Sequence, residues 1–377
     1  MNEPNRRILV TGAKGFIGKT LCIRLAECPD TTVISFTRDS DVTTLRDIIA
    51  NVDAVIHLAG ENRPSDDSAF MAVNHGLTAT ICDAILHENT TNGRKVPIVL
   101  ASSTQASSDN AYGKSKRAAE HAVKALADAT GIPATIFRLP GVFGKWCKPN
   151  YNSVVATFCH NIARGLPVQI NNPDTSLTLV YVDDVVTELL AAIDTTTAGY
   201  ATANVAPEYT ITLGDLARQI NTYEAGRDLL NIGRVGTGLQ RALYATYVSY
   251  LPSDRFVYDI PQHADDRGVF VEVLKTADSG QFSFFSAAPG ITRGGHYHHT
   301  KTEKFMVIRG DALFRFRHIV TDERVEIRTS GVKSQIVETI PGWSHDITNV
   351  GNEELLVMLW ANEVFDRDLP DTIYSKV

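Results

Sequence analysis

Cysteine is scarce in this sequence: the 377 residues contain five, an odd number, and no two of them have C-x-x-C spacing. This excludes a disulfide scaffold and indicates a reduced, cytoplasmic protein. Basic residues are not in excess either, because 36 Lys and Arg stand against 43 Asp and Glu. The resulting net charge of −7 disfavours non-specific binding to nucleic acid or to an anionic membrane surface.

Long apolar runs are also missing from the sequence. No stretch approaches the ~18–20 apolar residues of a membrane span, and the start, MNEPNRRILVTG, leads into a strand without the apolar region of a secretory signal. We therefore expect a cytoplasmic protein with neither a membrane nor a nucleic acid as partner. Disorder is excluded for most of the chain, because 44% of its residues are hydrophobic.

The first 140 residues alternate short β-branched runs with amphipathic segments. The expected strands are 7–11, 32–36, 53–59, 97–101 and 134–139. Between them, segments such as 18–27 and 115–128 are expected to form helices. This alternation predicts an α/β fold, a Rossmann-type doubly wound parallel sheet with helices on both faces.

The pattern changes near residue 250. Residues 256–360 contain period-2 runs such as VFVEVL, EKFMVIRG and ELLVMLW, separated by Gly, Pro and Asp. Such runs predict antiparallel strands in an all-β domain. We therefore predict two domains, 1–250 and 251–377.

A glycine-rich turn follows the first expected strand. Residues 8–18 read ILVTGAKGFIG, with Gly12, Gly15 and Gly18 between a strand and a helix. Glycine allows the backbone to turn tightly and to approach a pyrophosphate at the helix N-terminus. Because a second strand follows at 32–36, this context predicts a dinucleotide site.

The second strand is followed by Arg38, and no carboxylate occupies the expected ribose-binding position at its tip. A guanidinium can pair with the 2′-phosphate of NADP, whereas a carboxylate would repel it. We therefore favour NADPH as the cofactor. The alternative is a solvated Arg38 followed by Asp39, which could still serve the ribose of NAD.

A candidate catalytic set follows the fourth strand. Ser103 stands at the carboxyl end of that strand, and Tyr112 and Lys116 are four residues apart at the start of a helix. This spacing places both side chains on one helix face, where the ammonium stabilises a phenolate. Ser103 would hold a substrate carbonyl, Tyr112 would transfer its proton, and Lys116 would bind ribose and lower the pKa of Tyr112.

These residues resemble the extended short-chain dehydrogenase/reductase family. The matching stretches are TGAKGFIG (11–18), VDAVIHLAG (52–60), RLPGVFG (138–144) and YVDDV (181–185), with the catalytic set itself. The resemblance implies that a nicotinamide cofactor binds at the matching positions. These are Gly12, Lys14, Gly15, Phe16, Ile17, Gly18, Arg38, Leu58, Ala59, Gly60, Tyr112, Lys116 and Arg138.

The C-terminal part contains a candidate metal site. His296, His298 and Glu303 fall on adjoining expected strands, and a separate stretch supplies His345. Alternation along a strand places His296 and His298 on one face and turns His299 away. Three imidazoles and one carboxylate suit a divalent metal, with Zn²⁺ as the default and Fe, Mn or Ni left open.

Both stretches resemble the cupin signature. The first has Gly290, the His-x-His pair, Glu303 and Gly310, and the second has Gly342, His345 and Asn349. Upstream, DDRG (265–268) resembles the entry strand of nucleotide-sugar 3,5-epimerases, which are cupin-like barrels. The alternative is a cupin fold whose metal is purely structural or absent.

A reductase and an epimerase-like barrel would share a keto sugar as substrate. A ketone at C4 acidifies the proton at C3, so that a base can remove and return it through an enolate. Hydride delivery to C4 then removes the ketone. Epimerisation must therefore precede reduction.

The whole chain resembles the family of the bifunctional capsular polysaccharide synthesis enzyme CapF and its O-antigen counterparts. The resemblance includes GKWCKPNYNSVVATFC (144–159), YVSYLPS (247–253), HYHHT (296–300) and FDRDLPDT (365–372). It implies C3 epimerisation of UDP-2-acetamido-2,6-dideoxy-β-L-arabino-hexos-4-ulose in the cupin. NADPH reduction at C4 would then give UDP-N-acetyl-6-deoxy-L-talosamine, towards UDP-N-acetyl-L-fucosamine.

The same resemblance implies a homodimer with a zinc-bearing cupin and several contacts to the sugar nucleotide. The candidate substrate-binding residues are Lys145, Lys148, Asn150 and Arg267. Two other functions stay open at this point. The chain could be a one-step NADPH-dependent 4-keto reductase with a structural cupin, or a redox-sensing regulator that binds NADP without catalysis, although Ser103, Tyr112 and Lys116 argue against the regulator.

Overall fold

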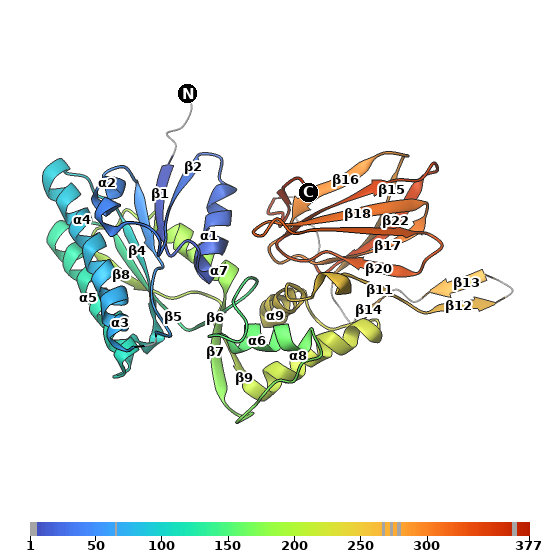
Figure 1. Cartoon of the computed structure of the whole chain (residues 1–377), viewed down its shortest axis with the longest axis horizontal. Coiled ribbons are helices and arrows are strands. Elements are labelled where there is room, and N and C mark those ends of the chain that lie inside the picture. Colours follow the sequence, from blue (N-terminus) through green and yellow to red (C-terminus); the bar gives the residue numbers. More distant parts are fainter. Residues whose placement is uncertain (1–5, 65, 266–267, 272–273, 277–279, 364–367) are drawn as a thin grey trace. The chain divides into compact units, whose positions relative to one another are not determined.

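The computed structural model describes residues 6–64, 66–265, 268–271, 274–276, 280–363 and 368–377. The chain forms two compact units (Figure 1). The first contains residues 1–142 and 178–210, and the second contains residues 143–177 and 211–377. Packing thus groups the segment 143–177 and the helices after residue 211 with the C-terminal strands. The domain boundary near residue 250 stays a prediction. The described elements after residue 256 are all strands.

The first unit is built on a six-stranded sheet in the order β2-β1-β3-β4-β5-β8. Its strands are β1 (Arg6–Thr11), β2 (Thr31–Phe36), β3 (Ala54–His57), β4 (Ile98–Ser103), β5 (Ala134–Leu139) and β8 (Tyr200–Ala203). Every pair in this sheet is parallel. The predicted doubly wound parallel sheet is confirmed, and β8 adds a sixth strand to the five expected ones.

Helices cover both faces of this sheet (Figure 1). They are α1 (Phe16–Ala26), α2 (Leu45–Ile49), α3 (Ser68–Phe70), α4 (Leu77–Asn92), α5 (Ala111–Thr130) and α7 (Val182–Ala192). Alternation along β1 divides the core in two. Leu9 packs in a cluster with Ile81 and Val123, from α4 and α5. Ile8 packs in the opposite cluster with Leu21 and Val185, from α1 and α7.

One helical segment in the described residues, Ser68–Asn92, is long and apolar enough by length and composition to cross a membrane, with a mean hydropathy of 1.3. Core helices of globular domains meet the same criteria. Ile81 and Ile85 of this segment are fully buried against the sheet. The segment is therefore a packing element of the first unit.

The second unit combines helices with two five-stranded antiparallel sheets. Its helices are α6 (Val154–Ile162), α8 (Leu213–Asp228) and α9 (Gly238–Val248). One sheet has the order β11-β20-β17-β22-β15 and the other β19-β18-β21-β16-β23. The first contains β11 (Val257–Asp259), β15 (Gln281–Ala287), β17 (Glu303–Arg309), β20 (Gln335–Glu338) and β22 (Leu355–Ala361). The second contains β16 (Thr292–Tyr297), β18 (Asp311–His318), β19 (Arg324–Ser330), β21 (Trp343–Asn349) and β23 (Ile373–Tyr374).

The two five-stranded sheets enclose a common core. Phe305 of β17 packs edge-on against Phe314 of β18, so that side chains of the two sheets meet. The predicted all-β C-terminal architecture is confirmed. Three smaller sheets complete the described strands. One contains β6 (Gly141–Phe143), β7 (Ser176–Tyr181) and β9 (Tyr209–Thr212). The other two pair β10 (Asn231–Ile232) with β14 (Lys275–Thr276), and β12 (Gln262–Asp265) with β13 (Gly268–Val271).

Candidate active site and metal centre

The glycine-rich turn connects β1 to α1. Gly12 has a left-handed φ of +69°, and a Cβ there would lie 2.8 Å from the backbone nitrogen of Ala59. A Cβ at Gly18 would lie 2.2 Å from the carbonyl oxygen of Gly12. Both positions therefore require glycine. Because α1 begins at Phe16, its free N–H groups meet at this turn and form a site for an anion such as pyrophosphate.

A buried hydrogen-bond chain holds the segment that faces this turn. Thr78 donates to the carbonyl of Asn74 at 2.6 Å, so its oxygen accepts from Nε2–H of His57 at 2.8 Å. The other ring nitrogen, Nδ1, then accepts from the hydroxyl of Thr11 at 2.6 Å. The Thr11 oxygen in turn accepts from the backbone N–H groups of Leu58 and Ala59. Burial lowers the pKa of His57 to about 3, which keeps the ring neutral as this chain requires.

The structure brings the predicted catalytic residues together. Ser103 is the last residue of β4, and Tyr112 and Lys116 lie in the first turns of α5. Burial raises the pKa of Tyr112, and a side-chain hydrogen bond between Tyr112 and Ser103 opposes that rise. The Lys116 Nζ is 6.0 Å from the centre of the Tyr112 ring.

Lys116 is buried. Its Nζ donates to the carbonyl oxygen of Ala101 at 3.1 Å. Burial lowers its pKa to about 8, while Glu120, one turn further along α5, opposes the shift. A Cβ at Gly60 would lie 3.2 Å from this Nζ. Glycine at position 60 therefore leaves the room that the lysine occupies.

Sequence reasoning did not identify two residues of this site, Glu120 and Asn74. Glu120 accepts from Arg138 at 3.0 and 2.6 Å and from the hydroxyl of Ser102 at 2.5 Å. Asn74 binds the backbone of Glu61 and donates to Ser115 at 2.9 Å. The guanidinium of Arg138, predicted to contact the cofactor, is thus paired with Glu120. The i, i+4 spacing of Lys116 and Glu120 was the available signal for Glu120.

Arg38 lies at the end of β2, where the sequence predicts it. Its side chain is 87% exposed, and its guanidinium lies 3.1 Å from a carboxylate oxygen of Glu61. Lys14, in the glycine-rich turn, pairs with Asp39 at 2.8 Å. The negative charge of Asp39 is therefore balanced beside the exposed guanidinium.

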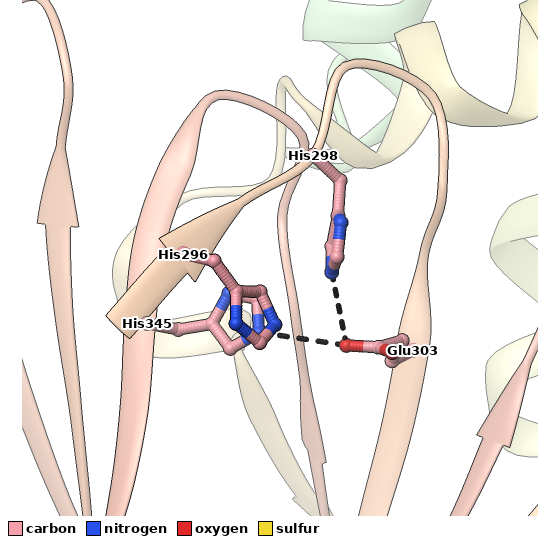
Figure 2. Close-up of side chains that lie close together, drawn as sticks. All are labelled: His296, His298, Glu303 and His345. Carbon is pink, nitrogen blue, oxygen red and sulfur yellow. Dashed lines mark hydrogen bonds and ion pairs between the residues drawn. The ribbon is translucent and has the colours of Figure 1, made fainter. Parts of the chain in front are cut away.

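Four predicted metal ligands converge in the second unit. The side chains of His296, His298, Glu303 and His345 point toward one another, and their ligand atoms all lie within 4.8 Å of one another (Figure 2). Glu303 Oε2 is 3.1 Å from His298 Nε2 and 3.4 Å from His345 Nε2. His296 pairs with His345 across β16 and β21. His298 lies just beyond the end of β16, so the adjoining loop rather than strand alternation aims its ring.

The electrostatics of this cluster suit a cation. Burial, then the neighbouring imidazoles of His345 and His298, lower the pKa of His296 to about 3. Burial also lowers the pKa of His345. Although burial raises the pKa of Glu303, His298 and His345 hold it well below its ordinary value. Two imidazoles are thus kept neutral and the carboxyl is kept ionised, which are the forms that bind metal.

The cluster fits a divalent metal on a second observation. Nε2 of His345 is buried and makes no well-aligned hydrogen bond among the described residues, although the Glu303 carboxylate lies 3.4 Å away. A buried polar atom with so poorly aligned a contact is better satisfied by an ion. His299 lies outside the group and packs edge-on against Tyr297, with ring centres 5.5 Å apart.

Three of the four candidate substrate contacts are described. Lys145 is 1% exposed, and its Nζ lies 5.2 Å from the centre of the Trp146 ring. The Nζ of Lys148 lies 5.1 Å from the centre of the Tyr151 ring. The backbone N–H of Asn150 donates to Thr157 at 2.9 Å. Arg267 lies outside the described residues.

Comparison with known proteins matches two segments of the chain to protein families. Residues 8–206 match the NAD dependent epimerase/dehydratase family, and residues 263–373 match the polysaccharide biosynthesis C-terminal domain. The crystal structure of the capsular polysaccharide assembling protein CapF from Staphylococcus aureus is 38% identical, with a TM-score of 0.63, over 98% of this chain and 100% of that chain. The chain belongs to the CapF-like family.

Two curated relatives add to this assignment. The UDP-2-acetamido-2,6-beta-L-arabino-hexul-4-ose reductase of Pseudomonas aeruginosa is 55% identical over 98% of this chain and 99% of its own length. The spore coat polysaccharide biosynthesis protein SpsL of Bacillus subtilis is 24% identical over 30% of this chain and 83% of its own length. This chain contains both matched domains, and the match of residues 8–206 to an NAD dependent family supports a nicotinamide cofactor.

Proposed function

We propose that the chain is a bifunctional nucleotide-sugar enzyme of capsule or O-antigen biosynthesis. The barrel would epimerise UDP-2-acetamido-2,6-dideoxy-β-L-arabino-hexos-4-ulose at C3. The first unit would then reduce C4 with NADPH, giving UDP-N-acetyl-6-deoxy-L-talosamine, a precursor of UDP-N-acetyl-L-fucosamine. The reductase named in Pseudomonas aeruginosa, 55% identical over nearly the full length of both chains, supports the 4-keto UDP-sugar as substrate.

The reduction uses the Ser103, Tyr112 and Lys116 set. NADPH supplies the hydride for C4 when it is bound at the glycine-rich turn. Tyr112 donates the proton to the C4 oxygen, and Ser103, which already bonds the Tyr112 hydroxyl group, holds that oxygen in place. The ammonium of Lys116 stabilises the phenolate that remains. The preference for NADPH rests on Arg38, since its side chain is exposed and a guanidinium pairs well with a 2′-phosphate.

The epimerisation uses the four-ligand cluster of the barrel. We propose that His296, His298, Glu303 and His345 hold Zn²⁺ or another divalent metal. A bound divalent metal supplies Lewis-acid stabilisation of the oxygen that becomes negative when the C3 proton leaves. The four side chains of this cluster would hold the metal in a largely buried site. Epimerisation precedes reduction, because the ketone at C4 is what acidifies C3.

The observation that carries this proposal is the coexistence in one chain of a reductase triad and a buried His₃Glu cluster. The test is incubation with the 4-keto UDP-sugar in D₂O, followed by NMR, with and without NADPH. We expect deuterium at C3 without cofactor and a 4-hydroxy product with it. Reduction with no C3 exchange under any condition would leave a one-step reductase with a structural barrel.

The remaining assignments are proposals as well. We propose a cytoplasmic homodimer whose functional domains are 1–250 and 251–377. We also propose that Lys145, Lys148, Asn150 and Arg267 contact the sugar nucleotide. Alanine variants of the two lysines should raise the KM for the UDP-sugar while the Kd for NADPH is unchanged. Sedimentation at several concentrations measures the oligomeric state.

A further inference from the structure

The C-terminal segment of the chain holds the loop that presents a metal ligand. The carboxylate of Asp371 accepts hydrogen bonds from three consecutive backbone N–H groups of that loop. The donors are His299 at 2.8 Å to Oδ1, and Thr300 at 2.7 Å and Lys301 at 2.8 Å to Oδ2. The Thr300 hydroxyl adds a fourth bond to Oδ2, at 2.9 Å. One side chain thus satisfies the backbone of the whole turn that follows His298.

The backbone of the same residue contacts the ligand ring directly. The carbonyl oxygen of Asp371 is 2.5 Å from Nδ1 of His298. A carbonyl only accepts, so Nδ1 carries the hydrogen and donates. This leaves Nε2 as the nitrogen for a metal, and Nε2 is the atom that faces Glu303 at 3.1 Å. A hydrogen bond to the far ring nitrogen is the usual device that sets the tautomer and orientation of a ligating histidine.

Further contacts hold the segment that follows Asp371 and the loop that follows His298. β23 (Ile373–Tyr374) pairs with β16 at His296 and Tyr297. Thr372 accepts from Nζ of Lys301 at 3.2 Å. From the other direction, Arg241 of α9 donates to the Thr300 hydroxyl. The loop 298–301 therefore lies between a helix and the C-terminal segment, and Asp371 contributes most of the contacts from that segment.

We propose that Asp371 is a positioning residue for the metal centre: its carboxylate fixes the loop 298–301, and its carbonyl orients the His298 ring. The proposal rests on the proposed metal function of the barrel. It concerns a residue more than 70 positions beyond His298, outside both histidine stretches. By linkage, metal binding and docking of the C-terminal segment stabilise each other.

The test compares metal binding by full-length Asp371→Asn with that of the wild type. An amide places an NH₂ group where one carboxylate oxygen now accepts, so at least one of the four bonds is lost and repulsion replaces it. We expect metal-free Asp371→Asn to bind Zn²⁺ about 10- to 100-fold more weakly in competition with a chelator. Its Co²⁺ form should show a shifted visible spectrum, because the His298 ring is no longer held at the same angle.

The matched control is Asp322→Asn. Asp322 lies in the same unit, and its side chain is 69% exposed in weak contacts with Arg317 and Arg324. This variant should bind Zn²⁺ and Co²⁺ as the wild type does. Wild-type affinity and an unchanged Co²⁺ spectrum in folded Asp371→Asn would overturn the positioning role alone. Absence of metal binding by the wild-type protein would overturn the metal centre and this proposal together.

A second measurement needs no variant and so does not depend on how Asp371→Asn folds. Hydrogen exchange of the wild-type protein, with and without Zn²⁺, follows the amides of His299, Thr300 and Lys301. Zn²⁺ should slow exchange of these amides, since the metal and Asp371 hold the same loop. Equal exchange with and without bound Zn²⁺ would contradict the proposed linkage.

Discussion

Gly342 packs directly against the indole ring of Trp146: a Cβ at Gly342 would lie 2.5 Å from Cζ2 of that ring. Gly342 also has a left-handed φ of +82°. It belongs to the turn that leads into β21 and His345, so this close approach joins the segment 143–151 to a strand that carries a proposed metal ligand. Two constraints therefore require glycine at one position.

Gly342→Ala should lower the free energy of unfolding by about 2–4 kcal/mol, because it adds a steric clash to the strain of a left-handed backbone. Gly290→Ala is the matched control in the same unit. Its φ is +78°, and no described atom lies within 4 Å of its Cβ position. This control should lose about 1 kcal/mol. Urea unfolding measures both, and equal losses would show that the Trp146 contact yields readily.

Tyr112→Phe should reduce NADPH-dependent turnover of the 4-keto UDP-sugar by about 10²- to 10⁴-fold, since the phenol is the proposed proton donor. The Kd for NADPH should change little, because the ring stays in place against Phe70. The control is Tyr200→Phe, an exposed tyrosine of β8 in the same unit. Undiminished turnover in Tyr112→Phe would remove the tyrosine from the mechanism.

Lys116→Met should inactivate the reductase and yet stabilise the fold at pH 7. Burial lowers the pKa of Lys116 to about 8 in the folded protein, below the ordinary 10.5, so the buried ammonium is a destabilising group at pH 7. Its removal should raise the free energy of unfolding by about 1–3 kcal/mol. Between pH 8 and 10.5 the folded wild type loses this proton before the unfolded chain does, so wild-type stability rises and the gain shrinks.

Denaturant unfolding at pH 7 and pH 10 measures this difference. Lys114→Met is the control, because Lys114 is exposed on the same helix. It should leave stability within about 0.5 kcal/mol of the wild type at both pH values. A destabilised Lys116→Met at pH 7 would mean that the bond to Ala101 outweighs the burial of the charge.

Arg38→Ala should raise the Kd for NADPH by about 10- to 100-fold and leave the Kd for NADH within about twofold. The reason is that only NADPH carries the 2′-phosphate that the guanidinium would bind. Arg46→Ala, at another exposed arginine of the same unit, serves as the control. Fluorescence titration of both cofactors measures the constants, and a parallel weakening of NADPH and NADH would contradict the assignment of Arg38.

Metal removal should separate the two activities. Chelator-treated protein is expected to lose C3 exchange and to lower its Tm, because binding to the folded state alone stabilises it. Reduction of a substrate that already has the product configuration at C3 should persist, since the triad lies in the other compact unit. Loss of both activities at full NADPH binding would argue against separable reactions.

Local chemistry in the sequence was sufficient to predict the parallel sheet, the turn at Gly12 and Gly18 and the Tyr112–Lys116 pair. Each depends on short-range rules: alternation of strand and helix, the need for glycine at a left-handed turn, and the i, i+4 spacing of a helix. The four candidate metal ligands could also be picked out, because both histidine stretches have recognisable spacings; that they bind a metal stays a prediction.

Only the tertiary structure decided the long-range partners. Local spacing does not predict that Thr11 meets His57, that Arg138 meets Glu120, or that His298 meets Asp371. Each pair joins segments that are distant in the sequence and that only the folded chain brings together. The grouping of residues 143–177 with the C-terminal strands has the same origin. Sequence patterns determine which groups a segment buries, whereas packing of the complete chain determines which of them meet.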